Sequence, residues 1–357
     1  MGTSSYESDV MQVTHDNHFV SQSYLRRWSE DGHRVWCYRI LVPQKKAPEW
    51  ELRSVQGVAY QRDLYTSLVG GQEIDEFERW LEAEFETPAQ NAIERAVHGD
   101  ILSASDWERL VRYMATQDLR TPLNYIESIM RWNDQLPEIL RRTLDKAVRN
   151  LEEAKRTGRK PKTEPATGKQ PFADVFKIKV DPYARPETKQ GEIRVEVVAG
   201  RRLWLESQCH VLNKTAQVLV SHSWSIAEAA NNTEWFTSDH PVARINYYGE
   251  GNYDLKGGWG KKGGNLLMPL SPKHLLFTQI GEDLPNRFVL SDRQTSEIQR
   301  FIAERAHRTI FAHKRMPEVK RLRPRQVNLE MYREEQEAWR NWHSDQSRAE
   351  QDLEEGK

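Results

Sequence analysis

The stretch RVWCYRI at residues 34–40 decides the fold class, because its alternating β-branched and aromatic residues are typical of a strand. Residues 43–48 begin and end with proline, which predicts a turn. Residues 50–58 are then expected to pair back as a second strand. The chain therefore begins with a small β element.

Helices are expected next. Apolar residues recur at helical spacing and predict a helix from about residue 73, interrupted near Pro88 and capped by Gly99. The pattern Ser105-Asp-Trp-Glu108 fits a capping box and predicts a helix over about 106–119. Thr121 and Pro122 read as an N-cap and a first-turn proline of a helix that extends to about 156. Pro137 should bend or split that helix.

The chain from residue 157 onwards is expected to form a sheet with flanking helices. Residues 157–171 are rich in Pro, Gly and Lys, which predicts a flexible connection. Strands are expected at 172–180, 192–198, 235–245, 265–270, 274–280 and 309–313. A helix followed by a strand is expected over 202–229, and a further helix over 294–308. The segment GGWGKKGG at 257–264 predicts a mobile loop, either a plain hairpin or a lid.

These elements predict an α+β fold, with an N-terminal β element and helices packed on a C-terminal mixed sheet. We expect one domain over residues 15–313, with 157–171 as an excursion from it rather than a domain boundary. Residues 314–357 are expected to form a charged tail, with one exposed helix from about 325.

Composition limits the function. The 52 Lys and Arg residues balance 53 Asp and Glu residues, so the chain lacks the basic excess typical of polynucleotide-binding proteins. Two cysteines, Cys37 and Cys209, cannot build a disulfide framework or a cysteine zinc site. The absence of an apolar signal segment and of an apolar run of membrane-spanning length predicts a cytoplasmic protein without a membrane partner.

Four stretches carry a family resemblance: NHFVSQSYLRRW at 17–28, QDLRTP at 117–122, FTSDHPV at 236–242 and PLSP at 269–272. In this order they resemble domain-of-unknown-function family number 4238. The family pattern has Asn and Pro where this chain has His240 and Ser21. The resemblance implies no reaction, so it supplies candidate positions and no chemistry.

His18 and Gln22 are the candidates in the first stretch. His18 titrates near neutrality and could act as a catalytic acid or base, with Gln22 holding a substrate or orienting the imidazole. The alternative is that His18 packs locally and that Gln22 is a structural bridge. His15 and His18 alone are too few ligands for zinc.

Gln117 and Arg120 are the candidates in the second stretch. They lie three residues apart and therefore share a helix face. The guanidinium of Arg120, beside the helix start at Thr121, could bind a carboxylate or phosphate. The alternative is a buried arginine whose ion pair joins two helices.

Thr237, Ser238 and Asp239 are the candidates in the third stretch. Thr237 and Ser238 could bind substrate, and Asp239 could be a general base, a ligand for a divalent metal or the group that orients a histidine. The alternative is a turn in which Ser238 and Asp239 cap their own backbone.

Two functional hypotheses remain, beside a third option of pure scaffolding that holds if the motif residues are scattered through the core. The first is an enzyme acting on a phosphate-bearing substrate, either nuclease-like or a nucleotide hydrolase of the microbial defence or toxin type. The second is a non-catalytic module that binds a small ligand or nucleic acid, in which the aromatic residues stack on a ring. In both, we expect His18, Gln22, Gln117, Arg120 and Asp239 to line one pocket.

Overall fold

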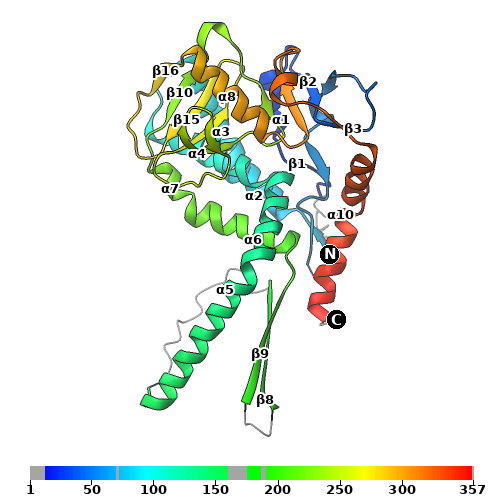
Figure 1. Ribbon diagram of the computed structural model, residues 1–357, viewed down its shortest axis with the longest axis vertical. Coiled ribbons are helices and arrows are strands. Elements are labelled where there is room, and N and C mark those ends of the chain that lie inside the picture. The colour runs from blue at the N-terminus through cyan, green and yellow to red at the C-terminus, as the bar shows by residue number, and fades with distance from the viewer. Residues whose placement is uncertain (1–12, 70–71, 160–174, 186–189, 356–357) are drawn as a thin grey trace, which may run out of the picture.

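The computed structural model describes residues 13–69, 72–159, 175–185 and 190–355 (Figure 1). Two protruding elements, the helix α5 and the hairpin β8–β9, extend from one end of a compact body, and the C-terminal helix α10 runs along its side. The described residues have the α+β fold that the sequence predicts.

A six-stranded mixed sheet forms the centre of the body. Its strands follow the order β13-β12-β14-β15-β10-β16, in which only β10 and β16 are parallel. The bounds are β10 Ser225–Glu228, β12 Ala243–Gly249, β13 Asn252–Asp254, β14 Gly264–Pro269, β15 His274–Gln279 and β16 Arg287–Val289.

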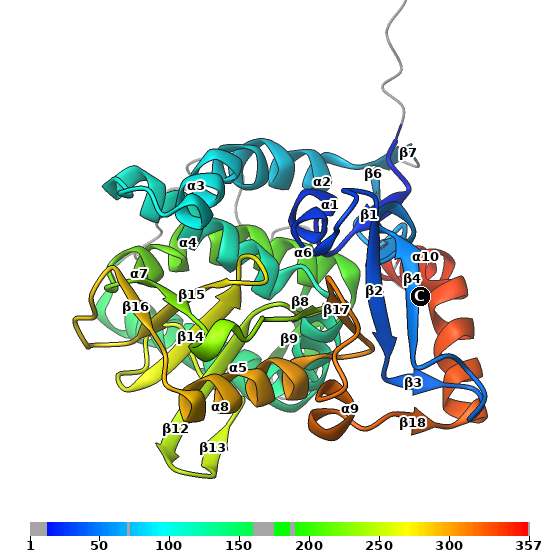
Figure 2. The ribbon, with the colours of Figure 1, turned by 90° about the horizontal axis from the view of Figure 1, so that it is seen from above.

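Both faces of this sheet are covered, as the side-chain alternation of β14 shows. Leu266 and Met268 pack into one apolar cluster with residues of α3 and α4, whereas Leu267 packs into a second cluster with α8. Successive strand residues point to opposite faces, so a strand that is apolar at every position is expected to lie between two helical layers. Figure 2 shows the sheet with α4 on one side and α8 on the other.

The helices begin and end at recognisable signals. Gly99 adopts a left-handed conformation after α3, as predicted, and Thr121 accepts a hydrogen bond as N-cap of α5. The helices span α1 Gln22–Leu25, α2 Glu76–Leu81, α3 Thr87–His98, α4 Ala104–Leu119, α5 Pro122–Thr157, α6 Arg201–His210, α7 Gln217–Val220, α8 Asp292–Arg305, α9 Val319–Leu322 and α10 Leu329–Glu355.

Several local predictions need correction. The capping box of α4 is formed by Ser103 and Asp106, two residues before the predicted pair, because Ser103 has the extended backbone that an N-cap requires. A π-helical turn, Glu82–Glu86, joins α2 to α3, so Pro88 lies in a first helical turn, which tolerates proline. The helix α5 continues through Pro137, so a split at this residue is excluded and the bend stays a prediction.

A four-stranded sheet holds the N-terminal β element. Its order is β11-β17-β2-β4, with bounds β2 Arg34–Arg39, β4 Trp50–Ser54, β11 Thr237–Ser238 and β17 Thr309–Ala312. The predicted pairing of the first two strands is confirmed, because β2 and β4 are antiparallel neighbours. The chain passes from this sheet to the six-stranded sheet between β11 and β12, through Asp239, His240 and Pro241.

The remaining strands form two-stranded pairs: β1 Asp16–His18 with β5 Tyr60–Arg62, β3 Leu41–Val42 with β18 Gln326–Val327, β6 Ser67–Val69 with β7 Gln72–Ile74, and β8 Phe176–Arg185 with β9 Gln190–Val197. Strands at 176–185 and 190–197 agree with those expected at 172–180 and 192–198. The predicted flexible connection at 157–171 lies largely outside the described residues.

Most of the C-terminal tail is the helix α10, as expected, but α9 and β18 precede it and one face of α10 is buried. Trp342 packs with Trp204 and Tyr65, and its indole N–H donates to the carbonyl of Asp63 at 3.0 Å. Arg201, fully buried in α6, pairs with Glu350 at 2.7 Å. The helix α10 is therefore docked on the body, and the prediction of an exposed tail helix is wrong for this face.

Candidate functional site

The four family stretches converge through hydrogen bonds. The Tyr24 hydroxyl donates to the carbonyl of Pro269 at 2.6 Å and lies 2.7 Å from the Thr237 hydroxyl, so it joins three stretches. Arg120 of the remaining stretch donates to the carbonyl of His18. The stretches therefore form one junction, next to the crossing between the two sheets.

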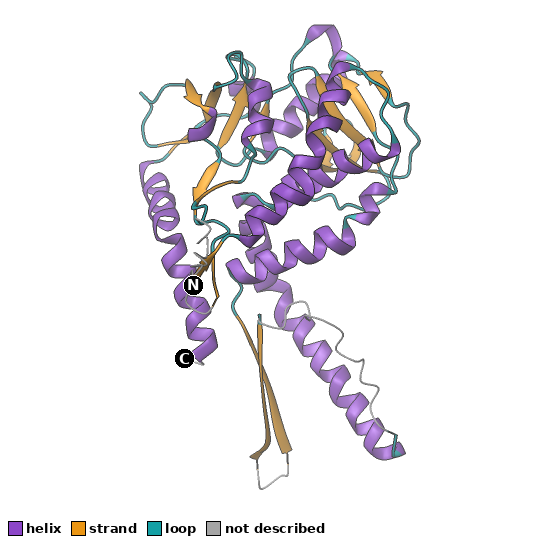
Figure 3. Cartoon of the chain, turned by 180° about the vertical axis from the view of Figure 1, so that it is seen from behind, coloured by secondary structure: helices purple, strands orange, loops and turns teal. Residues whose placement is uncertain are grey.

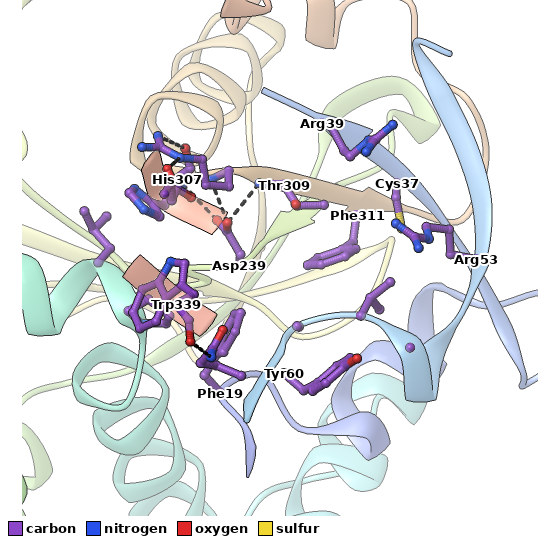
Figure 4. A pocket seen from close by; sticks show the side chains of 18 of the residues that line it. Phe19, Cys37, Arg39, Arg53, Tyr60, Asp239, His307, Thr309, Phe311 and Trp339 are labelled. Atoms are coloured by element: carbon purple, nitrogen blue, oxygen red, sulfur yellow. Dashed lines mark hydrogen bonds and ion pairs between the residues drawn. The ribbon is translucent and has the colours of Figure 1, made fainter. Parts of the chain in front are cut away.

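A first pocket of about 280 Å³ opens at this junction, and we call it the Asp239 pocket. Three family stretches contribute to its lining, through Phe19, Pro122 and Asp239. Figure 4 shows Asp239 and His307 at one end and Arg53 at the other, with Phe19 and Tyr60 along one wall.

The charged lining of the Asp239 pocket carries more guanidinium groups than carboxylates. Its cations are Arg39, Arg53 and Arg308, and its carboxylates are Asp239 and Glu335. Arg308 pairs with Glu335 at 2.6 Å and Arg39 with Glu51 at 3.1 Å. Arg53 is half exposed and its contact with Glu51 is 4.0 Å long, so it is the cation that an incoming anion can engage most readily.

Asp239 is held by the backbone of the segment between α8 and β17. Its carboxylate accepts N–H groups of His307 at 2.8 Å, Arg308 at 2.6 Å and Thr309 at 2.9 Å. Burial raises the pKa of Asp239 to about 6, although the three N–H donors oppose that rise. These donors lie in a segment distant along the chain, so the predicted cap of its own backbone is wrong for Asp239, and the lining position leaves its carboxylate facing the pocket.

Two neighbouring side chains lack the protonation state that nucleophilic or acid catalysis would need. Burial lowers the pKa of His307 to about 3, so its imidazole is neutral at pH 7. Burial raises the pKa of Cys37 to about 12, so its thiol stays protonated and is a poor nucleophile. The pocket therefore has better features for binding than for covalent chemistry.

A second pocket of about 560 Å³ lies beyond β1, and we call it the His18 pocket. His18, Gln22 and Arg120 line it together with Glu78, Glu82 and Glu86. His18 lines this pocket and Phe19 the Asp239 pocket, so adjacent residues of one segment separate the two cavities.

Arg120 is fully buried and paired. Its guanidinium contacts Glu86, lies 3.6 Å from Glu78 and donates to the His18 carbonyl. It therefore has the ion pairs of the structural alternative, joining α4 to the segment around α2. The helix α2 and the π-helical turn that follows bring Glu78 and Glu86 to the same guanidinium.

Glu78 and His18 of this pocket have shifted pKa values. Burial raises the pKa of Glu78 to about 7, against the opposing effect of Arg120. Burial also lowers the pKa of His18, assisted by Arg120 and opposed by its contact with the Gln56 carbonyl. A carboxyl that is half protonated near neutral pH, in a pocket that an imidazole also lines, is a pattern found at acid–base sites.

His240 belongs to a sealed network rather than to either pocket. Its ring contacts the Thr121 hydroxyl and lies 3.5 Å from Asp118, and both side chains are fully buried. Burial lowers the pKa of His240 to about 4, so the ring is neutral. His240 contacts Thr121 on one side and Asp118 on the other, but all three side chains are buried, so no substrate can reach them. We assign this network a structural role.

The glycine-rich segment closes over this network. The Trp259 indole donates to Asp118 at 2.8 Å, and the Trp259 carbonyl contacts His222 at 2.7 Å. A Cβ at Gly257 would come within 2.9 Å of the backbone of β12, which explains a glycine there. These contacts anchor the segment at its centre, and its mobility stays a prediction.

The other expected site residues are buried. Gln117 is fully buried and lies away from both pocket linings. Thr237 bonds to Tyr24, and Ser238 donates to the carbonyl of His240 in a short turn. The five residues expected in one pocket are thus divided: three line the His18 pocket, Asp239 lines its neighbour and Gln117 lines neither.

Sequence reasoning missed the arginines of the Asp239 pocket and Glu78. Arg39 and Arg53 share a face of adjacent strands with Val35 and Cys37, because β2 and β4 pair Val35 with Arg53. Charged residues inside a predicted apolar strand were a signal that could have indicated this site. Glu78 carried no such signal, since it reads as a solvated helix residue.

Neither a metal-binding cluster nor a membrane-spanning helix is found among the described residues. Within the described ranges, no group of three or more His, Cys, Asp or Glu side chains is placed to bind a metal ion. None of the helices in the part of the chain that the structure describes is long and apolar enough to cross a bilayer.

Comparison with known proteins gives one match. Residues 16–316 match the model of the family described as "Protein of unknown function (DUF4238)". No curated protein and no solved structure matches the chain. The helix α10, which supplies Glu335, Gln336 and Trp339 to the Asp239 pocket, lies outside the matched residues.

Proposed function

The chain belongs to the DUF4238 family, and we propose that it binds a compact phosphate-bearing ligand with a planar ring, of the mononucleotide class, in the Asp239 pocket. The observation that carries this proposal is the excess of guanidinium groups in a pocket that is also walled by aromatic rings. Guanidinium groups suit phosphate, and aromatic faces suit a base.

The size of the pocket narrows the ligand class. A volume of about 280 Å³ lies near the lower end of the range for small-ligand sites, which favours a mononucleotide over a dinucleotide or a polynucleotide. The near-zero net charge of the chain agrees, since a polynucleotide ligand would favour an extended basic surface.

Calorimetric titration of the full chain with AMP, GMP, CMP and UMP tests the proposal, with the matching nucleosides and inorganic phosphate as partial ligands. We expect at least one mononucleotide to bind more tightly than either of its parts. Arg53→Gln should weaken that binding by about tenfold or more, because a charge-assisted contact is lost.

The matched control is Arg149→Gln, which removes an exposed arginine of α5 far along the chain from the pocket lining. The Arg149→Gln variant should bind the mononucleotide with the same affinity as the unmodified chain. If no mononucleotide binds at millimolar concentration, or if both substitutions weaken binding equally, the proposal is wrong.

A second candidate function is catalysis on a phosphate-bearing substrate in the His18 pocket, because Glu78 and the backbone of His18 contact one guanidinium. There, Glu78 would be the acid and His18 the base. Nucleotides, RNA and DNA incubated with the protein and Mg²⁺ or Mn²⁺ should be cleaved, and Glu78→Gln should abolish the cleavage while binding in the Asp239 pocket persists. Intact substrates under all these conditions would exclude this enzyme.

A further inference from the structure

The hairpin β8–β9 projects from the body beside α5 (Figure 3), and the pairing of its strands gives it an apolar face. Its register pairs Phe176 with Val197, Ile178 with Val195 and Val180 with Ile193. Directly paired residues share a face, so these six side chains form one surface. Ile178 and Val180 are 63% and 65% exposed, although a two-stranded hairpin is only marginally stable alone. A further strand paired to the hairpin would therefore stabilise it.

The two edges of the hairpin differ. Strand β8 contains Lys177, Lys179 and Pro182, and lysine and proline are residues that discourage pairing at a sheet edge. Strand β9 has no proline and carries the alternating charges of Glu192, Arg194 and Glu196. Among the described residues, its outer edge makes no backbone hydrogen bond. The strand β9 is therefore the edge open to a partner.

We propose that a second copy of the chain pairs with this edge, β9 against β9 in antiparallel orientation about a two-fold axis. With Val195 opposite Val195 of the other copy, Arg194 of each copy faces Glu196 of the other, twice by symmetry. Ile193 then faces Val197, so the apolar faces join into one. The strand is self-complementary in charge and in hydrophobicity in this register.

The neighbouring registers fit less well. Centring the axis on Arg194 places the two Arg194 side chains opposite each other and Glu192 opposite Glu196, and like charges directly opposite are destabilising. Centring it on Ile193 keeps an opposite-charge pair but sets Gly191 against Val195, which loses apolar contact. A pairing of one strand from each copy is small compared with a standard interface, so the dimer should be weak and concentration-dependent.

Sedimentation equilibrium of the full chain between about 5 and 500 μM tests the proposal, because weak dimers with a Kd in the micromolar range dissociate across that interval. The unmodified chain should show a monomer–dimer equilibrium. Arg194→Glu should raise the dissociation constant about tenfold or more, because both symmetric charge pairs become repulsive. The same substitution faces Lys179 within the hairpin, so it should not weaken the hairpin itself.

A rescue variant, Lys177→Gln/Arg194→Glu/Glu196→Arg, should restore the dimer, because facing residues of the two copies regain opposite charge and, within the hairpin, the new arginine no longer faces a lysine. Arg149→Glu, the same charge change at an exposed position of α5, should leave association unchanged. A chain that stays monomeric at 500 μM, a rescue variant that stays dissociated, or equal effects of Arg194→Glu and Arg149→Glu would each overturn the proposal.

Discussion

Replacing Glu78 by glutamine should make the stability of the fold less dependent on pH. Glu78 lies 3.6 Å from the fully buried guanidinium of Arg120, and burial raises its pKa from 4.5 to about 7. A shift of about 2.5 pKa units corresponds to about 3 kcal/mol between the two protonation states. Glutamine resembles the protonated carboxyl and cannot ionise.

Proton binding by Glu78 sets the direction in which the free energy of unfolding changes with pH. Because the folded state binds the proton more tightly than the unfolded state, the stabilisation is complete below about pH 4.5 and is lost as pH rises through about 7. The unmodified chain loses this stabilisation between about pH 4.5 and pH 7, whereas the glutamine variant has no proton to lose and keeps its stability. The free energy of unfolding of Glu78→Gln, relative to the unmodified chain, should therefore rise by about 2.5 kcal/mol between pH 5 and pH 8.

Urea unfolding at pH 5, 6, 7 and 8 measures this difference, with circular dichroism and tryptophan fluorescence as coincident probes of two-state behaviour. The matched control is Glu84→Gln, which removes an exposed carboxylate of the π-helical turn that follows α2 and is not among the groups that shift the pKa of Glu78. Exposed charges contribute little to stability, so the control difference should stay near zero across the range. A relative stability of Glu78→Gln that is constant with pH, or that falls as pH rises, would refute the reasoning.

Two further predictions concern buried polar contacts. Arg201→Met should destabilise the fold by about 3–5 kcal/mol and raise amide exchange in α10, since Glu350 is left buried without its cation; exchange that rises only in α6 would show that the pair does not dock the helix. Tyr24→Phe should cost about 1–2 kcal/mol in urea unfolding, because the Pro269 carbonyl and the Thr237 hydroxyl lose their shared partner; an unchanged midpoint would mean that the hydroxyl does not hold the family stretches together.

Much of the fold was predictable because its signals are local. The alternation of residues 34–40 gave a strand, and Gly99 and Thr121 marked a helix end and a helix start through backbone conformations that depend on neighbouring residues. The capping box of α4 was displaced by two residues because two overlapping serine-and-acid patterns occur there, and only the backbone conformation at Ser103 chooses between them. The family membership was likewise carried by short stretches of sequence.

The candidate sites were predictable only in part, because their geometry depends on residues far apart in the chain. The sequence identified His18, Arg120 and Asp239, whereas folding placed Asp239 in a different pocket from the other two. Arg308 became a neighbour of Asp239 only after β11 paired with β17, and Arg53 joined the same pocket only after β2 paired with both β4 and β17.

The sequence by itself determined the α+β class, most helix and strand positions and the family, since periodicity and capping are properties of nearby residues. The tertiary structure alone decided which polar side chains are sealed and which face a cavity. The chain crosses between its two sheets at Asp239 and His240, where one residue turns towards a pocket and the next into a buried network. Burial then sets their pKa values, to about 6 and about 4, and no local pattern encodes that difference.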